Sequence, residues 1–439
     1  MLMGRFGAQS IRMIAGAALA AACALLLAAC GGGDGGSTST NASTGQKAAA
    51  SKNVVDPAAA ENAKGTVTMC VPKDVSGAFH ATVKSLNAQG GVQAKLLELP
   101  ESADEQRNQL VQREEAKSPE CDVMGIDVIW TAEFANQGWL KDVSPAIAQR
   151  RSEFIPSTLE TLHYGGKYWG FPYNSNAAVL YYRSDEVAKA PTTWEDVYRL
   201  AAQKKGITYQ GAPYEGLTCD FLELLYSAGG KVLSDDGKSP AIDSPQTRKA
   251  LDFMVSGIKD GAASRAVVAQ MEEESRRAFE QGKATFMRNW PYAYALGNKS
   301  KIKGKFKITT LPGIDGNPGS GVLGGTNLAI SAYSKNPGGA LAVINYFTSG
   351  VGQRLIGEGA TPPATTAAYK EPSVRKAIGL PDEVEHAVAQ AKPRPVSPVY
   401  PQISQAIYQN VNKALSGQLS TDDAIKNMSS QIQKALSTF

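Results

Sequence analysis

The fold is decided by residues 66–127, which read TVTMCVPKDVSGAFHATVKSLNAQGGVQAKLLELPESADEQRNQLVQREEAKSPECDVMGID. Three short, mostly apolar runs in this stretch are typical of buried strands: Thr66–Val71, Val92–Leu99 and Cys121–Ile126. Two segments with helical spacing separate them, Ser76–Gln89 and a segment that the capping-box pair Ser102 and Glu105 opens and Glu115 ends. Strands that alternate with helices predict a parallel sheet covered by helices on both faces, which is the α/β class.

The alternation continues through the rest of the chain. Thr192 or Thr193 caps a predicted helix that reads WEDVYRLAAQKK, and Ser244 followed by Pro245 opens another. The remaining expected elements are two extended segments, Tyr168–Pro172 and Ala178–Tyr182, and two C-terminal helices, Tyr400–Ser416 and Thr421–Ser437. A chain of this length with this alternation is long enough for two domains.

The N-terminus has the pattern of a bacterial lipoprotein signal. Two arginines precede an apolar run, Met13–Leu27, which is too short to span a bilayer comfortably. Residues 25–33 read LLLAACGGG, so Cys30 follows two small residues. We therefore predict a signal peptide over residues 1–29 and lipidation of Cys30, for example with palmitate. The alternative is a plain secretory cleavage after Ala-x-Ala.

A low-complexity segment follows the expected lipidation site. Residues 30–64 consist mainly of Gly, Ser, Thr, Ala and Asn, and they cannot bury enough apolar surface to fold. We expect a flexible linker here and the globular part over residues 65–439. The protein would then be extracytoplasmic and anchored by lipid to the cell membrane, at the outer face of the cytoplasmic membrane or in the periplasm.

Charge and motif content argue against several classes of protein. The formal net charge is +4 without a basic cluster, so nucleic acid is not an expected partner. Gly319–Gly324 matches a dinucleotide fingerprint, but it follows a Pro/Gly loop and leads into a strand-like run, which predicts a loop. The acidic run Glu272–Glu274 is typical of a solvated helix face. Catalytic motifs are mostly absent, with no nucleophile elbow, HExxH or phosphate loop, and we expect neither an enzyme nor a cofactor.

The cysteines are expected to pair outside the cytosol. Cys23 lies in the predicted signal peptide and Cys30 at the lipidation site, which leaves Cys70, Cys121 and Cys219. Because Cys70 and Cys121 lie on early predicted strands, we expect a disulfide between them and a buried Cys219. Metal binding is not expected, because the sequence has no Cys-x-x-Cys and its histidines are scattered.

Aromatic residues stand beside amide, carboxylate and glycine residues at the expected strand ends. The clusters are Asp127 with Trp130, Trp169 and Tyr173 with Asn174 and Asn176, Trp290 with Tyr292, and Gly324 and Gly325 before Thr326 and Asn327. A sugar has apolar C–H faces surrounded by hydroxyl groups, so a sugar site needs flat rings and planar polar groups. Open α/β sheets bind ligands at such strand ends. The alternative is that these rings pack the core.

Six segments of the chain resemble a known family. They read GIDVIWTAEFANQGWLKDVSP, GKYWGFPYNSNAAVLYYRSD, PTTWEDVYRLA, YEGLTCDFLELLYSAGG, FEQGKATFMRNWPYAY and VLGGTNLAISAYSKN. In this order the segments are similar to the family 1 extracellular solute-binding proteins of ABC importers, and to the trehalose/maltose-binding branch in particular. The resemblance implies a two-lobed periplasmic-binding-protein-like fold of type II, with hinge-connected lobes and a ligand cleft between them. The expected lobe boundaries are 65–175 and 284–333 for lobe I, and 176–283 and 334–439 for lobe II.

The resemblance also implies roles for individual residues. Asp127 would accept hydrogen bonds from sugar hydroxyls, Trp290 would stack on the sugar, and Gly325 would donate from its backbone. Asn174 and Asn176 stand where the family places an aromatic and an acidic ligand residue. This chain departs from the branch at Thr326, where Trp is usual, and at Asn176, where Asp is typical. Further expected ligand contacts are Tyr292, Glu215, Arg394 and Arg107, of which the last three are equally expected as surface ion pairs.

These observations together predict a non-enzymatic, monomeric, lipid-anchored receptor. It would capture a sugar, such as the disaccharides trehalose or maltose, and deliver it to the permease subunits of an ABC transporter. One alternative is a secreted carbohydrate-active enzyme, which needs two carboxylates across a cleft. Another is a binding protein for a different solute, such as a polyamine, an amino acid or an iron complex, which needs charged partners.

Overall fold

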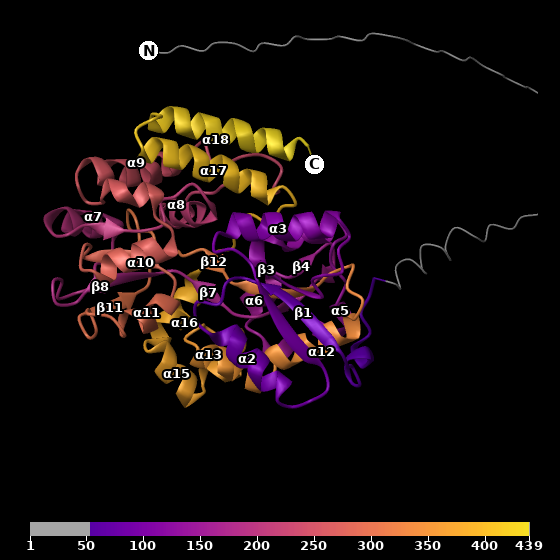
Figure 1. Ribbon diagram of the computed structural model, residues 1–439. Coiled ribbons are helices and arrows are strands. Elements are labelled where there is room, and N and C mark those ends of the chain that lie inside the picture. The colour runs from indigo at the N-terminus through magenta and orange to yellow at the C-terminus, as the bar shows by residue number, and fades with distance from the viewer. Residues whose placement is uncertain (1–52, 439) are drawn as a thin grey trace, which may run out of the picture. The chain divides into compact units, whose positions relative to one another are not determined.

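The computed structural model describes residues 53–438 (Figure 1). All of them belong to one compact unit, Ala48–Phe439. The predicted signal peptide over residues 1–29 and Cys30 lie outside the described residues. Among residues 53–438 we find no helix with the length and apolarity that a membrane span requires.

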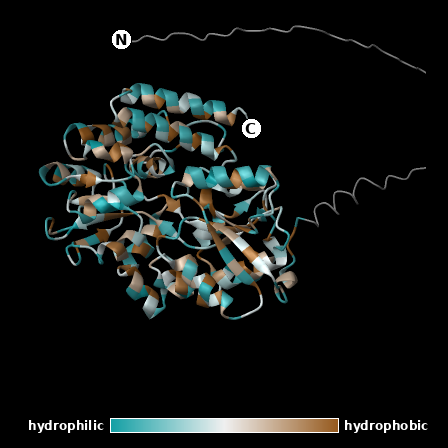
Figure 2. Ribbon diagram, in the orientation of Figure 1, coloured by the Kyte–Doolittle hydropathy of each residue, from teal (hydrophilic) through white to brown (hydrophobic). Residues whose placement is uncertain are grey.

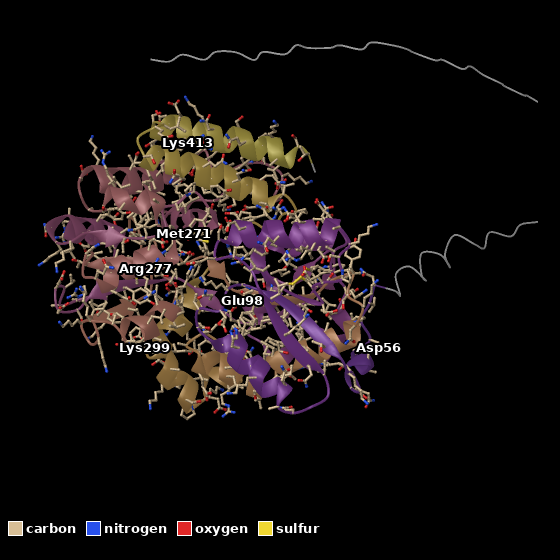
Figure 3. The ribbon with its side chains drawn as sticks, viewed as in Figure 1. Asp56, Glu98, Met271, Arg277, Lys299 and Lys413 are labelled. Atoms are coloured by element: carbon tan, nitrogen blue, oxygen red, sulfur yellow. A yellow bond between two sulfur atoms is a disulfide. The ribbon has the colours of Figure 1, made fainter. Side chains whose placement is uncertain are left out.

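The last part of the expected flexible linker is folded. Val55 is buried, and its N–H donates to the carbonyl of Asp142 at 2.9 Å. Asp56, labelled in Figure 3, caps a short 3₁₀ helix, Pro57–Ala60, which packs against α12 (Pro337–Phe347). The globular part therefore begins before residue 65, because the buried Val55, the cap by Asp56 and the packing against α12 hold this segment in place.

The first lobe is built on a five-stranded sheet with the order β2-β1-β3-β13-β6. Its strands are β1 (Thr66–Val71), β2 (Gln93–Glu98), β3 (Val123–Asp127), β6 (Phe171–Pro172) and β13 (Thr326–Ile330). β1 pairs in parallel with β2 and β3, as the sequence predicts, and β13 runs antiparallel to β3 and β6. The helices of this lobe are α2 (Ala78–Asn87), α3 (Ala103–Glu115), α4 (Thr131–Asn136), α5 (Ser144–Arg150), α6 (Pro156–Glu160), α12 and α13 (Gly350–Glu358). Ser102 precedes α3, but its side chain makes no capping hydrogen bond.

The second lobe is built on a four-stranded sheet with the order β11-β8-β10-β9. Its strands are β8 (Val179–Arg183), β9 (Ile207–Thr208), β10 (Phe286–Asn289) and β11 (Phe306–Thr309). The helices around it are α7 (Trp194–Gln203), α8 (Glu215–Ser227), α9 (Pro245–Lys259), α10 (Glu272–Glu280), α11 (Tyr292–Gly297), α15 (Pro372–Ile378), α16 (Pro381–Gln390), α17 (Tyr400–Leu415) and α18 (Thr421–Leu436). Thr193 and Ser244 cap α7 and α9 with their side chains, as expected. Figure 2 shows hydrophobic residues along the central strands and hydrophilic ones on the outer helices α3 and α18.

The chain crosses between the two sheets beside a small two-stranded pair. β7 (Asn176–Ala177) links β6 to β8, and it pairs with β12 (Leu323–Gly324), which leads back into β13. A further crossing follows α13, because α14 (Thr366–Tyr369) leads from the first lobe to α15 in the core of the second. The α/β class and the two-lobed fold are thus confirmed.

The lobes observed differ from the expected boundaries in two places. Residues 284–309 contain β10 and β11, which pair in the second sheet, and α12 and α13 pack in the first lobe. Both differences have one cause. The local pattern of a short buried strand or an apolar helix does not say which of two sheets it joins.

Cys70 and Cys121 are joined by a disulfide between β1 and the start of β3 (Figure 3), and Cys219 is a buried free cysteine on α8. For a chain that starts after residue 47, and therefore lacks Cys23 and Cys30, we expect one titratable thiol after denaturation without reductant. Titration with a disulfide reagent measures this, and Cys219→Ala, which should show none, is the control. Three thiols in the unreduced chain would contradict the pairing.

Candidate functional site

A cavity of about 180 Å³ lies between the lobes beside β7. Most of its walls come from the first lobe, from the loop after β1, from α2 and from the segment after β6, and Tyr292 comes from the second lobe. The lining residues are Lys73, Asp74, Val75, Ser76, Phe79, Tyr173, Asn174, Asn176, Tyr292, Thr326, Thr361 and Pro362. The cavity therefore lies at the strand ends of the first sheet, where open α/β sheets bind ligands.

Two asparagines give this cavity its amide groups. Asn174 is buried, and its Oδ1 accepts the backbone N–H of Thr326 at 2.7 Å, which fixes the start of β13 against the end of β6. The Oδ1 of Asn176 is buried and has no hydrogen-bond partner among the described residues. A buried acceptor without a partner costs about 1–3 kcal/mol. A hydroxyl donor that reached this oxygen would remove that cost.

Glycines at the hinge bring the amide and aromatic groups close together. A Cβ built on Gly324 would lie 3.2 Å from Cζ3 of Trp290 and 3.8 Å from Cβ of Asn176, so the indole ring and the asparagine flank this glycine. Gly325 has a φ of +133°, and a Cβ there would lie 2.9 Å from the carbonyl oxygen of Asn174. Both positions need glycine for close approach.

Trp290 is half-buried and held by polar neighbours. The guanidinium carbon of Arg288 lies 4.2 Å from its ring centroid, and its Nε1 donates to Glu272 at 3.4 Å. The second carboxylate oxygen of Glu272 accepts the hydroxyl of Tyr214 at 2.5 Å, and Tyr292 donates its hydroxyl to Glu273 at 2.8 Å. The expectation of a solvated helix face at Glu272–Glu274 is therefore wrong for Glu272 and Glu273, which orient the aromatic residues of the second lobe.

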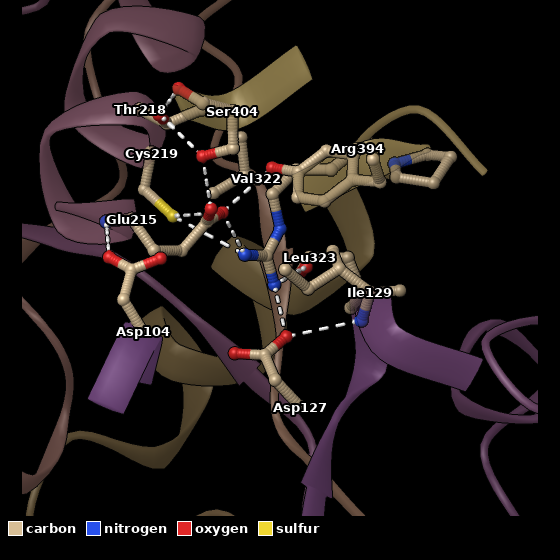
Figure 4. Close-up of polar contacts among 12 residues, drawn as sticks. Asp104, Asp127, Ile129, Glu215, Thr218, Cys219, Val322, Leu323, Arg394 and Ser404 are labelled. Atoms are coloured by element: carbon tan, nitrogen blue, oxygen red, sulfur yellow. Dashed lines mark hydrogen bonds and ion pairs between the residues drawn. The ribbon is translucent and has the colours of Figure 1, made fainter. Parts of the chain in front are cut away.

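An ion-pair network joins the two lobes at the end of β3 (Figure 4). Arg394 donates from Nη1 to Glu215 at 2.6 Å and from Nη2 to Asp127 at 2.9 Å. Tyr400 donates its hydroxyl to Glu215 at 2.7 Å, and Ser404 donates to the same carboxylate. These groups lie in the protein interior, so the expected alternative of a surface ion pair is wrong for Arg394 and Glu215.

Burial controls the charges in this network. It raises the pKa of Glu215 to about 6, although Arg394 and two hydroxyl donors favour the carboxylate. Burial alone would lower the pKa of Arg394, but Asp127 and Glu215 among its neighbours keep it well above the ordinary value. Arg394 therefore stays charged, and Asp127 remains the partly exposed end of the network.

The expected site residues fall into three groups. Asn174, Asn176, Tyr292 and Thr326 line the cavity, with Trp290 and Gly325 beside it. Asp127, Glu215 and Arg394 form the network, and Asp127 is the direct cross-strand neighbour of Thr326. Arg107 pairs with Glu133, with Nε 2.7 Å from the carboxylate, and does not line the cavity. Asp74 and Glu272 are not among the predicted site residues. Asp74 follows the strand β1, and its position at a strand end is a usable signal.

A larger cavity of about 420 Å³ lies between the residues after β3 and residues 391–396, and Arg394 is one of its lining residues. Its lining contains no tryptophan, tyrosine or asparagine, and consists of Val128, Ile129, Thr131, Ala132, Ser157, Glu160, Thr161, His163, Leu323, Ala391, Pro393, Arg394, Pro395 and Val396. Both cavities have groups that bind hydroxyls, but of the two only the smaller one also has phenylalanine and tyrosine rings and amide side chains, so we take it as the candidate site.

The chain is similar to known proteins in sequence and in fold. The family model described as bacterial extracellular solute-binding protein matches residues 73–354. A probable ABC transporter-binding protein of Deinococcus radiodurans is 33% identical over 368 residues, which are 78% of this chain and 87% of that protein. A mannitol-binding protein of Pseudomonas aeruginosa is 25% identical over 346 residues, covering 69% of this chain and 78% of that protein. The maltose-bound MalE3 protein of T. maritima has a similar structure, with a TM-score of 0.80 and 33% identity over 84% of this chain and 99% of that chain.

Proposed function

Because the chain belongs to the family of bacterial extracellular solute-binding proteins, we propose that it captures a sugar between its lobes and delivers it to the permease subunits of an ABC importer. The observation that carries the proposal is that Asn176, whose buried Oδ1 has no partner among the described residues, is one of the residues lining a cavity between the lobes. A sugar hydroxyl would satisfy this acceptor, and the half-buried Trp290 beside it would cover an apolar sugar face.

A disaccharide such as maltose or trehalose is the proposed ligand, and the size of the cavity sets a condition on it. The volume of about 180 Å³ lies below the range of about 300–1,000 Å³ that is common for ligand pockets. A disaccharide therefore requires the lobes to move apart before it enters and to settle around it afterwards. A smaller ligand fits the present volume better, which makes a monosaccharide or a polyol such as mannitol the second candidate.

The cellular part of the proposal rests on the N-terminal sequence. Residues 1–29 would direct export, and lipid on Cys30 would hold a monomeric receptor at the membrane beside its permease. The ligand-binding part would then work without a cofactor. The role is capture and delivery of the sugar without chemical change.

A thermal-shift screen tests the proposal. We expect one of maltose, trehalose, glucose or mannitol to raise the melting temperature, since a ligand at a hundred times its dissociation constant stabilises the folded state by about 2.7 kcal/mol. Asn176→Leu, which has a similar volume and no acceptor, should lose most of this shift. A chain that none of these ligands stabilises, or that hydrolyses maltose or trehalose, would contradict the proposed function.

A further inference from the structure

The buried helix α8 has no cap of its own at its N-terminus. Every residue of α8 from Glu215 to Ser227 is buried, and the side chain of Tyr214, at the N-cap position, makes no capping hydrogen bond. The first N–H groups of a helix have no partner within the helix and need one from elsewhere. At the end of a buried helix, water supplies that partner poorly.

Asp104 supplies the missing partner from the other lobe. Its Oδ2 accepts the backbone N–H of Glu215 at 3.1 Å (Figure 4). Asp104 lies in the first turn of α3, which packs under the first sheet through Leu110, in one hydrophobic cluster with Cys70 and Cys121. Helix α8 belongs to the core of the second lobe. A carboxylate beside a helix N-terminus is also favoured by the helix dipole.

We propose that Asp104 is a positioning residue that latches the two lobes together by capping α8 across the cleft. The cap exists only while α3 and α8 are adjacent, so it stabilises the closed arrangement and is lost when the lobes separate. A group that stabilises the closed state raises the apparent affinity for a ligand that binds this state. The effect on sugar affinity rests on the proposed function, whereas the effect on the ligand-free lobes does not.

The surroundings of Asp104 indicate which substitutions separate hydrogen bonding from charge. Burial raises the pKa of Asp104, the Glu215 amide and Arg107 lower it, and the nearby Asp127 and Glu105 raise it. Burial and the neighbouring carboxylates therefore disfavour a negative charge at this position. Asparagine keeps an acceptor of the same length without the buried charge, and Asn and Asp are similarly good helix caps.

The test compares variants of Asp104 with the wild type, all as the full chain. Calorimetry measures their affinity for maltose, and small-angle X-ray scattering measures their radius of gyration without ligand. For Asp104→Ala we expect affinity to fall about fivefold, because a helix cap contributes about 1 kcal/mol and 1.4 kcal/mol is a factor of ten. Asp104→Asn should keep the affinity within about twofold of the wild type. We expect the ligand-free wild type to populate the closed arrangement, in which Asp104 caps α8, and Asp104→Ala to increase its radius of gyration.

Ser420→Ala is the matched control, because Ser420 caps α18 within the second lobe by accepting the N–H of Asp423 at 3.1 Å. It should lower the melting temperature and leave both maltose affinity and the radius of gyration unchanged. Unchanged affinity in Asp104→Ala, or an equal loss in Asp104→Ala and Asp104→Asn, would overturn the latch. If the wild type binds neither maltose nor any other sugar of the screen, the proposed function fails, and an unchanged radius of gyration in Asp104→Ala then overturns the latch by itself.

Discussion

Replacing Arg394 with methionine should lower the free energy of unfolding by about 3–5 kcal/mol, because it leaves a buried carboxylate without its counter-ion. The Arg394 side chain is 2% exposed, and its guanidinium group bridges Glu215 and Asp127 at 2.6 and 2.9 Å. The Glu215 side chain is 6% exposed and cannot regain full hydration once the guanidinium is gone. Denaturant unfolding at pH 8 measures the difference.

The loss of stability in Arg394→Met should depend on pH. In the wild type the pKa of Glu215 is raised to about 6 by burial, against the attraction of Arg394. Without Arg394 we expect it to rise further, so the folded state binds a proton that the unfolded state has already released. Stability is then greatest below the unfolded pKa and is lost as the pH rises through the raised folded pKa. The loss in Arg394→Met should therefore be smaller at pH 5 than at pH 8.

Two variants serve as controls for Arg394→Met. Arg248 pairs with Asp422 at the surface, with about half of each side chain exposed, so Arg248→Met should cost at most about 1 kcal/mol. Adding Glu215→Gln to Arg394→Met should restore part of the stability, because the uncompensated charge is removed. Equal losses in Arg394→Met and Arg248→Met would show that the network contributes no more than a surface pair.

Much of the fold could be predicted because strands and helix caps depend on local sequence. The expected strand Thr66–Val71 is β1, and Thr193 and Ser244 cap the expected helices. Sheet membership could not be predicted, since the pairing of β10 (Phe286–Asn289) with β8 depends on contacts between residues about a hundred positions apart. Local patterns contain no information on such partners.

The same limit applies to the candidate site. Asn174, Asn176 and Thr326 could be found because each stands at an expected strand end beside aromatic or glycine residues. The role of Glu272 could not be found, because an acidic residue at the start of a helix looks the same whether it faces water or the indole of Trp290. The joining of Arg394 to Glu215 across 179 residues is likewise a property of the folded chain only.

The other large effect is expected from Trp290→Ala, which should weaken sugar binding by about 2–4 kcal/mol, or about thirtyfold to several hundredfold. The indole ring flanks Gly324 and Asn176 at the edge of the cavity, and Glu272 and Arg288 hold it in place. An ordered ring stacks on a sugar with little further loss of conformational entropy, and alanine offers no such surface. Calorimetric titration with the sugar that gives the largest thermal shift measures the loss.

The ring also contributes to the fold, because Trp290 packs against the hydrophobic core of the second lobe. We therefore expect Trp290→Ala to lower the ligand-free melting temperature as well. Trp194→Phe separates the two effects, since Trp194 is 3% exposed in the same core, away from the cavity. It should lower the melting temperature and leave the affinity unchanged. If Trp290→Ala and Trp194→Phe lose stability alike and both keep the affinity of the wild type, then Trp290 is a core residue. The stacking surface must then be sought among the rings that line the cavity, Phe79, Tyr173 and Tyr292, of which Phe79 and Tyr173 stack with their centroids 4.2 Å apart.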